Sequence, residues 1–284
     1  MKYILITCLV FSLSVSCQNK SASEPETKDN SLDLPGWKLL WNDEFDGTSI
    51  DSKKWNLEVN GNGGGNNELQ YYTNRPINAS IEKNDAGEGK LVIRATRENY
   101  TGADNVTKEY TSARLTTQNK VLARYSRVEV RAKLPGGKGT WPAIWMLGQN
   151  IGTVGWPKCG EVDIMENVGY DPYKILGSVH TELKNFKTGG NFSAGMTNQT
   201  VNTDFNIYAV EWFADHIDFY FNGNKYGTFT KPGSTESAWP FDQPCFILLN
   251  LAIGGDWGGS QGIDNSIFPC RFEIDYVRVY EKAD

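Results

Sequence analysis

Three acidic residues fall within six positions of one short segment, "GEVDIMENVG" at residues 160–169: Glu161, Asp163 and Glu166. The segment is apolar between its acids and bounded by glycines, which predicts a short β-strand. Side chains alternate faces along a strand, so Glu161 and Asp163 share one face while Glu166, five positions after Glu161, points away. A β-bulge near Ile164–Met165 would restore the phase and place all three acids on one face.

Two facing carboxyl groups are what glycoside hydrolysis requires. In the retaining mechanism they lie ~5–5.5 Å apart, one as nucleophile and one as acid/base. Positions four apart on a strand are ~13 Å apart at Cα, and two long glutamate side chains on a concave sheet can close most of that gap. Asp163 between them could hydrogen-bond the nucleophile, and mutual repulsion would keep one carboxyl protonated near neutral pH.

Other interpretations of the three acids stay open at this point. They could form a solvated strand face, or a calcium site, since hard cations bind clustered carboxylates, although the EF-hand pattern is absent. Serine-hydrolase chemistry is disfavoured, because the chain has two histidines, His180 and His216, and no G-x-S-x-G segment. The glycines at 61–65 open no helix, so they do not indicate a phosphate-binding loop.

Aromatic residues accompany the acids in glycine-rich segments. The relevant tryptophans are Trp141, Trp145, Trp156 and Trp257. Each could equally pack in a core or loop. Together they favour a carbohydrate-binding cleft, because aromatic faces pack on the C–H faces of sugar rings. Asn67, Glu68 and Gln70 would supply polar partners for sugar hydroxyls.

The elements that must position these residues are predicted to be strands. In "SRVEVRAKL" (126–134) Val128 and Val130 face one way and Arg127 and Glu129 the other. The dipeptide at 222–223, Asn-Gly, predicts a hairpin, and "PCFILLNLAIGG" (244–255) predicts a strand buried on both faces. The runs "KLVIRATRE" (90–98) and "FEIDYVRVYE" (272–281) add two more. We therefore expect an all-β sandwich, a jelly roll of two curved antiparallel sheets.

The N-terminal segment is expected to lie outside this domain. Residues 1–16 combine Lys2 with an apolar run and small residues, as in a secretion signal. Cys17 follows directly, which indicates a lipoprotein signal with a lipidated cysteine. The alternative is ordinary cleavage near Ser16. Residues 17–33 are polar and are expected to be a flexible tether. The domain then covers residues 34–284.

Charge and cysteine content restrict the partners. The net charge is −6 and no basic stripe occurs, so nucleic acid is not an expected partner. The domain holds Cys159, Cys245 and Cys270, whose spacing is not that of a zinc site. Export permits one disulfide, for which Cys245–Cys270 is the first choice, and three buried free thiols are the alternative. We expect a monomer.

In these residues and motifs the chain resembles glycoside hydrolase family 16. "GEVDIMENVG" is similar to the family's E-x-D-x-x-E signature in its form with an inserted residue. Further blocks resemble, in order, the bacterial laminarinase branch of endo-β-1,3-glucanases: "WNDEF", "NNELQYYT", "GTWPAIWMLG", "GSVHTE", "PFDQPCFILLNLAIGGDWGG" and "IDYVRVYE". The resemblance covers about residues 36–282 and argues against a merely solvated acid face. It implies a jelly roll with a long substrate cleft.

The resemblance implies roles for the three acids. Glu161 matches the nucleophile, Glu166 the acid/base and Asp163 the assisting acid of a retaining double displacement. Met165 matches the inserted bulge residue. No cofactor is implied for catalysis.

The resemblance also implies substrate contacts. His180, in "GSVHTE", matches a histidine near the acid/base, with a purely structural histidine as the alternative. The positions matching residues that hold glucose rings are Asn67, Trp141, Trp145 and Trp156.

Many members of the family bind a structural calcium ion away from the cleft. Glu44, the carbonyl of Gly89 and Asp275 lie at the matching positions. Ordinary acids at strand ends are the alternative interpretation.

The resemblance favours β-1,3-glucan as the substrate. The inserted-residue signature also occurs in branches that cut agar, porphyran and carrageenan, but those galactans usually call for basic cleft residues, and the matching blocks here are aromatic and amide-rich. Mixed-linkage β-1,3-1,4-glucan stays open, as does a non-catalytic carbohydrate-binding jelly roll, because fold alone does not decide function. The expected location is the cell envelope, with the outer membrane as partner of a lipid anchor, or the exterior.

Overall fold

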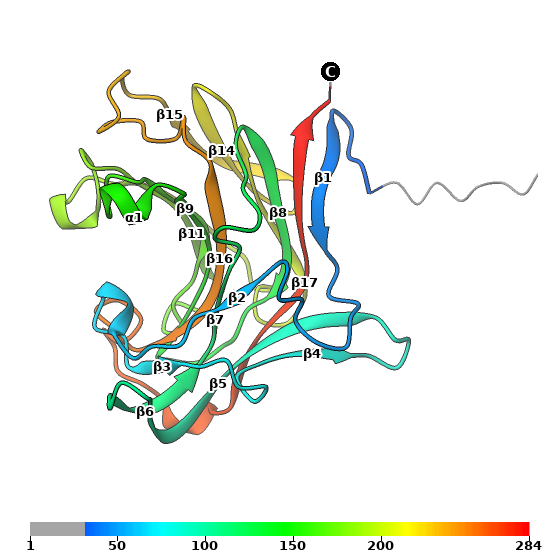
Figure 1. The fold of residues 1–284 in the computed structure, drawn as a ribbon, viewed down its shortest axis with the longest axis vertical. Helices are drawn as coiled ribbons and strands as arrows, with labels where there is room; N and C mark the ends of the chain where they lie inside the picture. Colours follow the sequence, from blue (N-terminus) through cyan, green and yellow to red (C-terminus); the bar gives the residue numbers. More distant parts are fainter. Residues whose placement is uncertain (1–31, 284) are drawn as a thin grey trace, which may run out of the picture. The chain divides into compact units, whose positions relative to one another are not determined.

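The computed structural model describes residues 32–283 (Figure 1). The proposed signal segment, Cys17 and nearly all of the tether lie outside these residues. One compact unit spans Asp33–Asp284. Within the described part, no helix has the length and apolar character needed to cross a membrane.

The larger of two sheets in residues 32–283 has ten strands. They are β1 (Trp37–Asp43), β3 (Gln70–Tyr72), β4 (Ala79–Lys83), β5 (Gly89–Thr101), β6 (Thr107–Ser112), β8 (Ser126–Lys133), β13 (Asn206–Trp212), β14 (His216–Phe221), β15 (Asn224–Thr230) and β17 (Cys270–Lys282).

The smaller sheet has seven strands in the same part of the chain. They are β2 (Asn56–Leu57), β7 (Arg114–Thr116), β9 (Thr140–Gly148), β10 (Glu161–Glu166), β11 (Lys174–His180), β12 (Phe192–Thr197) and β16 (Cys245–Ile253). Short helical turns interrupt the loops: η1 (Gly63–Gly65), α1 (Ile151–Val154), η2 (Phe186–Thr188) and η3 (Asn265–Ile267).

The two sheets form the expected all-β sandwich of curved sheets. The order in the larger sheet is β15-β14-β13-β8-β17-β5-β6-β3, with β1 also paired to β17 and β4 to β5; the smaller sheet runs β12-β11-β10-β9-β16-β7-β2. Strand pairing is antiparallel except between β3 and β6, which are parallel. In Figure 1 the strands of the smaller sheet bend, and its loops and α1 project away from the larger sheet.

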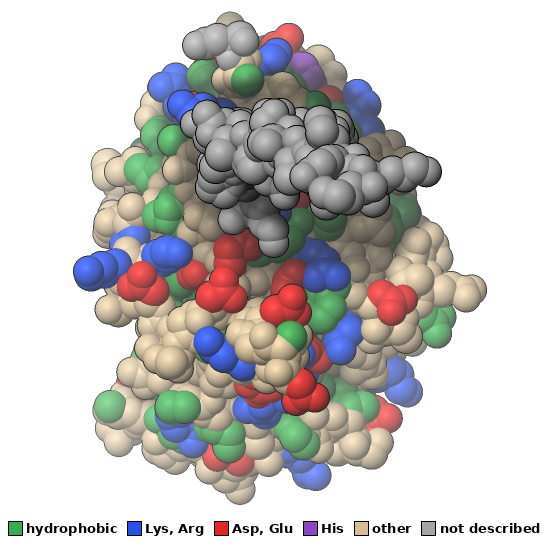
Figure 2. All heavy atoms as spheres, turned by 90° about the vertical axis from the view of Figure 1, so that its right-hand side faces the viewer, with side chains coloured by type: hydrophobic (Ala, Val, Ile, Leu, Met, Phe, Trp, Pro, Cys, Tyr) green, Lys and Arg blue, Asp and Glu red, His purple; other side chains and the backbone are tan. Residues whose placement is uncertain are grey.

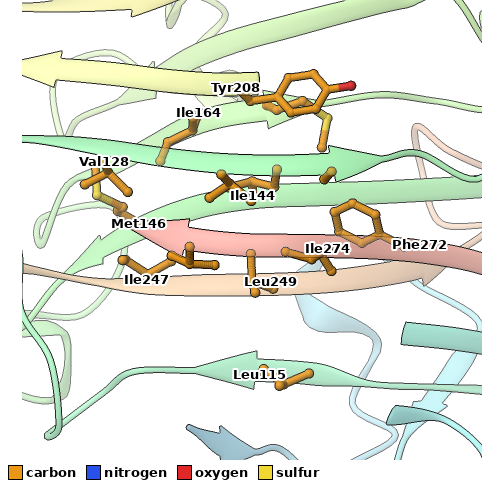
Figure 3. Packing of buried hydrophobic residues seen from close by; sticks show 14 of the residues in the cluster. Leu115, Val128, Ile144, Met146, Ile164, Tyr208, Ile247, Leu249, Phe272 and Ile274 are labelled. Carbon is orange, nitrogen blue, oxygen red and sulfur yellow. The ribbon is translucent and has the colours of Figure 1, made fainter. Parts of the chain in front are cut away.

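The core lies between the sheets because alternate side chains of facing strands meet there (Figure 3). Val128 and Val130 of β8 are fully buried in it, as the alternation predicts. Every residue of β16 is buried, which confirms a strand covered on both faces. Ile247 faces the main core, whereas Phe246 joins a second apolar cluster with Leu147.

The predicted hairpin joins β14 and β15. Asn222 and Gly223 both have positive φ, 47° and 78°. Two consecutive positive φ values are the geometry of the two-residue turn whose twist matches antiparallel strands. The turn chemistry therefore sets this register locally.

The outward face of the larger sheet is covered by ion pairs. Arg127 donates to Glu129 at 2.6 Å and to Glu211 at 2.8 Å, and Arg271 donates to Glu82 at 2.6 Å. Figure 2, which looks onto the side carrying β1 and β17, shows acidic and basic side chains interspersed. Acids on this face thus have counter-charges as neighbours.

The first-choice disulfide, Cys245–Cys270, is wrong: the three domain cysteines are free and buried. Cys245 begins β16 and bridges Ala123, just before β8. The first residue of β8, Ser126, pairs with Glu281, at the opposite end of β17 from Cys270. The two thiols therefore sit at opposite ends of the sandwich, beyond the ~7 Å Cα limit of a disulfide. The alternative of three free thiols is confirmed.

Candidate active site

The expected bulge is present in β10. Opposite β9, Asp163 pairs with Trp145, and Met165 pairs with the very next partner, Ile144, so one extra residue is accommodated between them. The same register shift appears against β11. Ile164 and Met165 consequently both point into the core. Glu166 therefore lies on the same cleft face as Glu161 and Asp163, although simple alternation along the strand would point it away.

Three adjoining hollows lie along the outer face of the smaller sheet, and Glu161 lines all of them. The first, the Lys187 hollow, has a volume of about 240 Å³. The second, the central hollow, holds all three acids, and the third, the Trp257 hollow, has a volume of about 320 Å³. Their walls include Asn66, Arg114, Trp141, Trp145, Trp156, Phe186, Asn250 and Asp256. The three acids thus sit in the middle of an extended cleft.

Two tryptophans orient the two glutamates. Trp156 Nε1 donates to Glu161 Oε2 at 2.5 Å, and Trp141 Nε1 donates to Glu166 Oε1 at 3.0 Å. An N–H donor stabilises the ionised carboxylate and fixes its rotamer. Sequence patterns predicted these tryptophans as sugar platforms; the structure adds that their ring nitrogens hold the acids.

Asp163 and His180 form a buried pair behind Glu161. His180 Nε2 lies 3.2 Å from Asp163 Oδ2, and both side chains are nearly inaccessible. A carboxylate oxygen of Asp163 also lies within 4.8 Å of one of Glu161. The rings of Trp156 and Phe186 lie 6.3 and 5.8 Å from that of His180. Asp163 therefore lies between Glu161 and His180 and can hydrogen-bond with either.

The site favours bound protons. Burial, followed by the neighbouring Asp163 charge, raises the pKa of Glu161 to about 8. Burial, followed by the charge of Glu161 against the stabilising Trp141 hydrogen bond, raises the pKa of Glu166 to about 7. Burial and the Glu166 charge also raise the pKa of Asp163 well above its ordinary value. The three neighbouring carboxyls together therefore hold at least one proton at neutral pH.

Of the remaining predicted substrate contacts, Trp145 lies in the cleft and Asn67 does not. Trp145 lines two hollows and donates from Nε1 to Asn250 Oδ1 at 2.7 Å. Asn67 lies outside the three hollows, is exposed, and donates to the carboxylate of Asp256. Its neighbour Asn66 takes the cleft position expected for Asn67. The difference arises because Asn67 adopts a positive φ, 56°, after a run of glycines.

Several cleft residues were absent from the sequence prediction, among them Arg114, Phe186, Lys187 and Asn250. Arg114 and Asn250 lie on paired strands, β7 and β16, next to the acids. Asn250 carried a usable signal, since it is the single polar residue within the apolar run of β16. Phe186 and Lys187 lie in a loop whose sequence has no distinguishing pattern.

The three residues matched to a calcium site converge on the other side of the sandwich. Glu44 directly follows β1, Gly89 begins β5, and both strands pair with β17, which carries Asp275. A Cβ on Gly89 would clash with the Phe45 carbonyl oxygen, so the backbones approach closely. Both carboxylates have arginine partners, Arg278 for Glu44 and one on β8 for Asp275.

Comparisons with known proteins agree with this geometry. The profile of glycosyl hydrolases family 16 matches residues 65–278. A β-glucanase from Rhodothermus marinus is 43% identical over 282 residues, covering 96% of this chain and 93% of the relative. The solved laminarinase of Rhodothermus marinus superimposes with a TM-score of 0.81 at 44% identity, over 87% of this chain and 98% of that one. SCLam, a non-specific endo-β-1,3(4)-glucanase crystallised as a variant with a bound glucan oligosaccharide, gives a TM-score of 0.83 at 41% identity, over 89% and 97%. The chain belongs to glycosyl hydrolases family 16.

Proposed function

We propose that this glycoside hydrolase cuts internal linkages of β-1,3-glucan by a retaining double displacement. The observation that carries the proposal is the bulge in β10, which brings Glu161, Asp163 and Glu166 onto one face inside a tryptophan-lined cleft. The names of the relatives, β-glucanase and laminarinase, support the substrate class.

In the first step, a carboxylate oxygen of Glu161 attacks the anomeric carbon while Glu166 gives its proton to the leaving glycosidic oxygen. A glycosyl ester forms on Glu161 and the C–O bond to the leaving sugar breaks. In the second step Glu166, now ionised, takes a proton from water, whose oxygen displaces Glu161 from the anomeric carbon. Two inversions retain the configuration. No cofactor takes part.

The supporting residues act on the charge of the two glutamates. The Trp156 N–H bond stabilises ionised Glu161 before attack and when it leaves again. Asp163, paired with His180, can hydrogen-bond Glu161 as its charge changes. Trp141 holds Glu166 in the orientation from which it delivers its proton.

The cleft charges support a neutral glucan rather than an anionic galactan. Arg114 and Lys187 are the basic side chains among the lining residues of the three hollows. Arg114 already pairs with Glu58 at 3.3 Å and stacks on Trp145. Lys187 lies over the Trp156 ring. The stated specificity of SCLam keeps mixed-linkage glucan as the second candidate substrate.

A substrate panel tests the proposal. Purified protein incubated with laminarin, mixed-linkage glucan, agarose and carrageenan should release oligosaccharides fastest from laminarin. The first sugar product seen by NMR should have the β configuration. Binding without any product would identify a non-catalytic carbohydrate-binding protein, and preferred cleavage of a galactan would overturn the substrate assignment.

We also propose a structural calcium ion at Glu44, Gly89 and Asp275. The convergence of their backbones supports it; an ion would share the Glu44 carboxylate with Arg278. A chelator should then lower the melting temperature, and added calcium should restore it, with the cleft residues untouched. An unchanged melting temperature would remove the site.

A last proposal concerns location: the protein is exported and anchored by a lipid on Cys17, as a monomer at the outer membrane. The support is the sequence of residues 1–17. Full-length protein should partition with membranes and a Cys17→Ala form should not. Equal release of both forms would exclude the anchor and leave plain secretion.

A further inference from the structure

The loop between β11 and β12 forms one wall of the cleft and carries a half-exposed aromatic side chain, Phe186. We propose that Phe186 is a specificity-determining residue that selects the curved β-1,3-linked chain over a straight β-1,4-linked segment beside Glu161. This inference rests on the proposed glucanase function and deepens it.

The loop is held in one conformation by its own hydrogen bonds. Asn185 is 3% exposed and accepts from the backbone N–H groups of Lys187 and Thr188, while the Thr188 hydroxyl accepts from the Asn185 N–H. The Asn185 side chain also donates to the Thr181 carbonyl at 3.0 Å. A capping box of this kind fixes the direction in which the following residue, Phe186, projects.

Phe186 packs beside the tryptophan that hydrogen-bonds the reacting acid. Its side chain is 49% exposed, yet its ring centroid lies 5.3 Å from that of Trp156 and 5.8 Å from that of His180. It lines the Lys187 hollow and the Trp257 hollow, and Glu161 lines both of these as well. A large apolar side chain that is left half exposed in a cleft and packed on fixed rings is suited to contact a ligand.

The opposite wall carries an amide, Asn66, and an indole, Trp257. Asn66 also lines the Lys187 and Trp257 hollows, and its carbonyl accepts from the Asp256 N–H at 2.8 Å. Phe186 follows β11, on one side of β10, whereas Asn66 is tied to the loop after β16, on the other side. A sugar chain that crosses from one hollow to the other therefore passes between Phe186 and Asn66 at Glu161.

The two linkages differ in how they use that passage. A β-1,4-linked glucan is a flat ribbon whose rings stay in line, whereas a β-1,3-linked glucan curls at each linkage. A curling chain can lay a C–H face against the Phe186 ring as it turns from one hollow into the next. A straight segment does not turn toward that ring and gains less contact with it. Phe186 therefore favours binding of the β-1,3-linked chain over that of a β-1,4-linked segment.

The test compares Phe186→Ala with the wild type on laminarin and on mixed-linkage glucan. We expect kcat/KM on laminarin to fall about tenfold, a usual effect of losing one apolar contact, while the value on mixed-linkage glucan stays or rises. Phe186→Tyr, which keeps the ring, should retain the wild-type ratio. Leu183→Ala is the matched control, because Leu183 is 56% exposed in the same loop and lines none of the three hollows.

Each outcome decides the matter. An equal loss on both substrates, or no loss on either, overturns the selection role while the wild type stays an active glucanase. A wild type inactive on every glucan overturns the proposed function, and this inference with it. A changed ratio in Leu183→Ala as large as in Phe186→Ala would show a general effect of the loop and also overturn the inference.

Discussion

Acids on the two outer faces of the sandwich behave in opposite ways. In the cleft, burial and a neighbouring carboxyl raise the pKa of Glu161 to about 8. On the larger sheet, hydrogen bonds from Arg271, and then from Arg94, outweigh partial burial and lower the pKa of Glu82. Both residues are glutamates on or beside a strand. What differs is the neighbour: a second carboxyl in the cleft, an arginine outside it.

This difference separates two uses of a carboxylate. With an arginine beside it, the group stays ionised and holds strands together. With a carboxyl beside it and water excluded, its pKa rises, and the group of cleft acids keeps a proton that Glu166 can deliver to a substrate. Repulsion between carboxyls therefore makes the electrostatics of the cleft unfavourable. The ion pairs on the outer face of the larger sheet compensate for it. Five substitutions and one control test this contrast.

The largest effect is expected from removing either glutamate of the cleft. Glu161→Ala and Glu166→Ala should each lower kcat on laminarin about a thousandfold or more, equivalent to about 4 kcal/mol of barrier. The two losses should differ in kind. Glu161→Ala should still couple a glucosyl fluoride of inverted configuration to an acceptor, because that donor mimics the intermediate. In Glu166→Ala, azide should intercept the intermediate formed from an activated aryl glycoside and give a product of retained configuration.

If azide instead rescues Glu161→Ala with inverted product, the two roles are exchanged. A loss of less than about tenfold in both variants, or roughly 1.4 kcal/mol, would place the catalytic centre elsewhere.

The next largest effect is expected on the outer face of the larger sheet. Arg127→Met leaves Glu129, 4% exposed, without its counter-charge. We expect a loss of about 3 kcal/mol in unfolding free energy, because an unpaired buried charge is costly, and a melting temperature lower by roughly 6–12 °C. Activity per folded molecule should not change. The control is Lys38→Met, since Lys38 and Glu281 form an exposed pair whose loss should shift the melting temperature little.

Asp163→Asn should cost less than loss of either glutamate, about thirtyfold in kcat, or roughly 2 kcal/mol. It alters the support of Glu161 and not a bond-forming group. Because the Asp163 charge helps raise the pKa of Glu161, the acid limb of the kcat/KM profile should move to lower pH. An unmoved profile with the same loss of rate would indicate a purely structural role.

The smallest effect has the opposite sign to that of Arg127. The folded pKa of Glu161 lies above the ordinary glutamate value, so native protein binds the proton more tightly than unfolded chain. Its contribution to stability is complete below about pH 4.3 and is lost as the pH rises towards 8. Glutamine does not ionise, so Glu161→Gln avoids this loss of stability at high pH. The substitution should raise the melting temperature at pH 9 by roughly 2–4 °C, or about 1 kcal/mol in unfolding free energy.

At pH 5 the same Glu161→Gln substitution should change the melting temperature little. A destabilised variant at pH 9 would mean that the cleft acids are not under strain, and the contrast between the faces would fail.

Local patterns predicted the parts of the site that one strand or turn controls. The period of two residues, with one acid out of phase, was enough to anticipate the bulge between Asp163 and Met165. The Asn222-Gly223 pair was enough for its hairpin. The resemblance to family 16 added the fold's cleft and the tryptophans around Glu161 and Glu166.

Contacts between distant segments escaped prediction. Phe186 reaches Trp156 across 30 positions of sequence, through a loop with no periodicity, so no pattern marks it. The shift from Asn67 to Asn66 depends on one positive φ after several glycines, which composition does not specify. The disulfide failed because spacing along the chain does not reveal that Cys245 and Cys270 begin strands at opposite ends of the sandwich.

The bulge in β10 has a consequence for how this site can change. Strand register moves in whole residues, so the position of Glu166 relative to Glu161 cannot be adjusted gradually. Substitutions at Ile164 or Met165 alter the volume of the core below the cleft but leave the acids on their face. Deleting one residue would move Glu166 and one core side chain together, in a single step. Variants of this centre with a different carboxyl separation therefore lie an insertion or deletion away, and libraries built from point substitutions alone would never sample them.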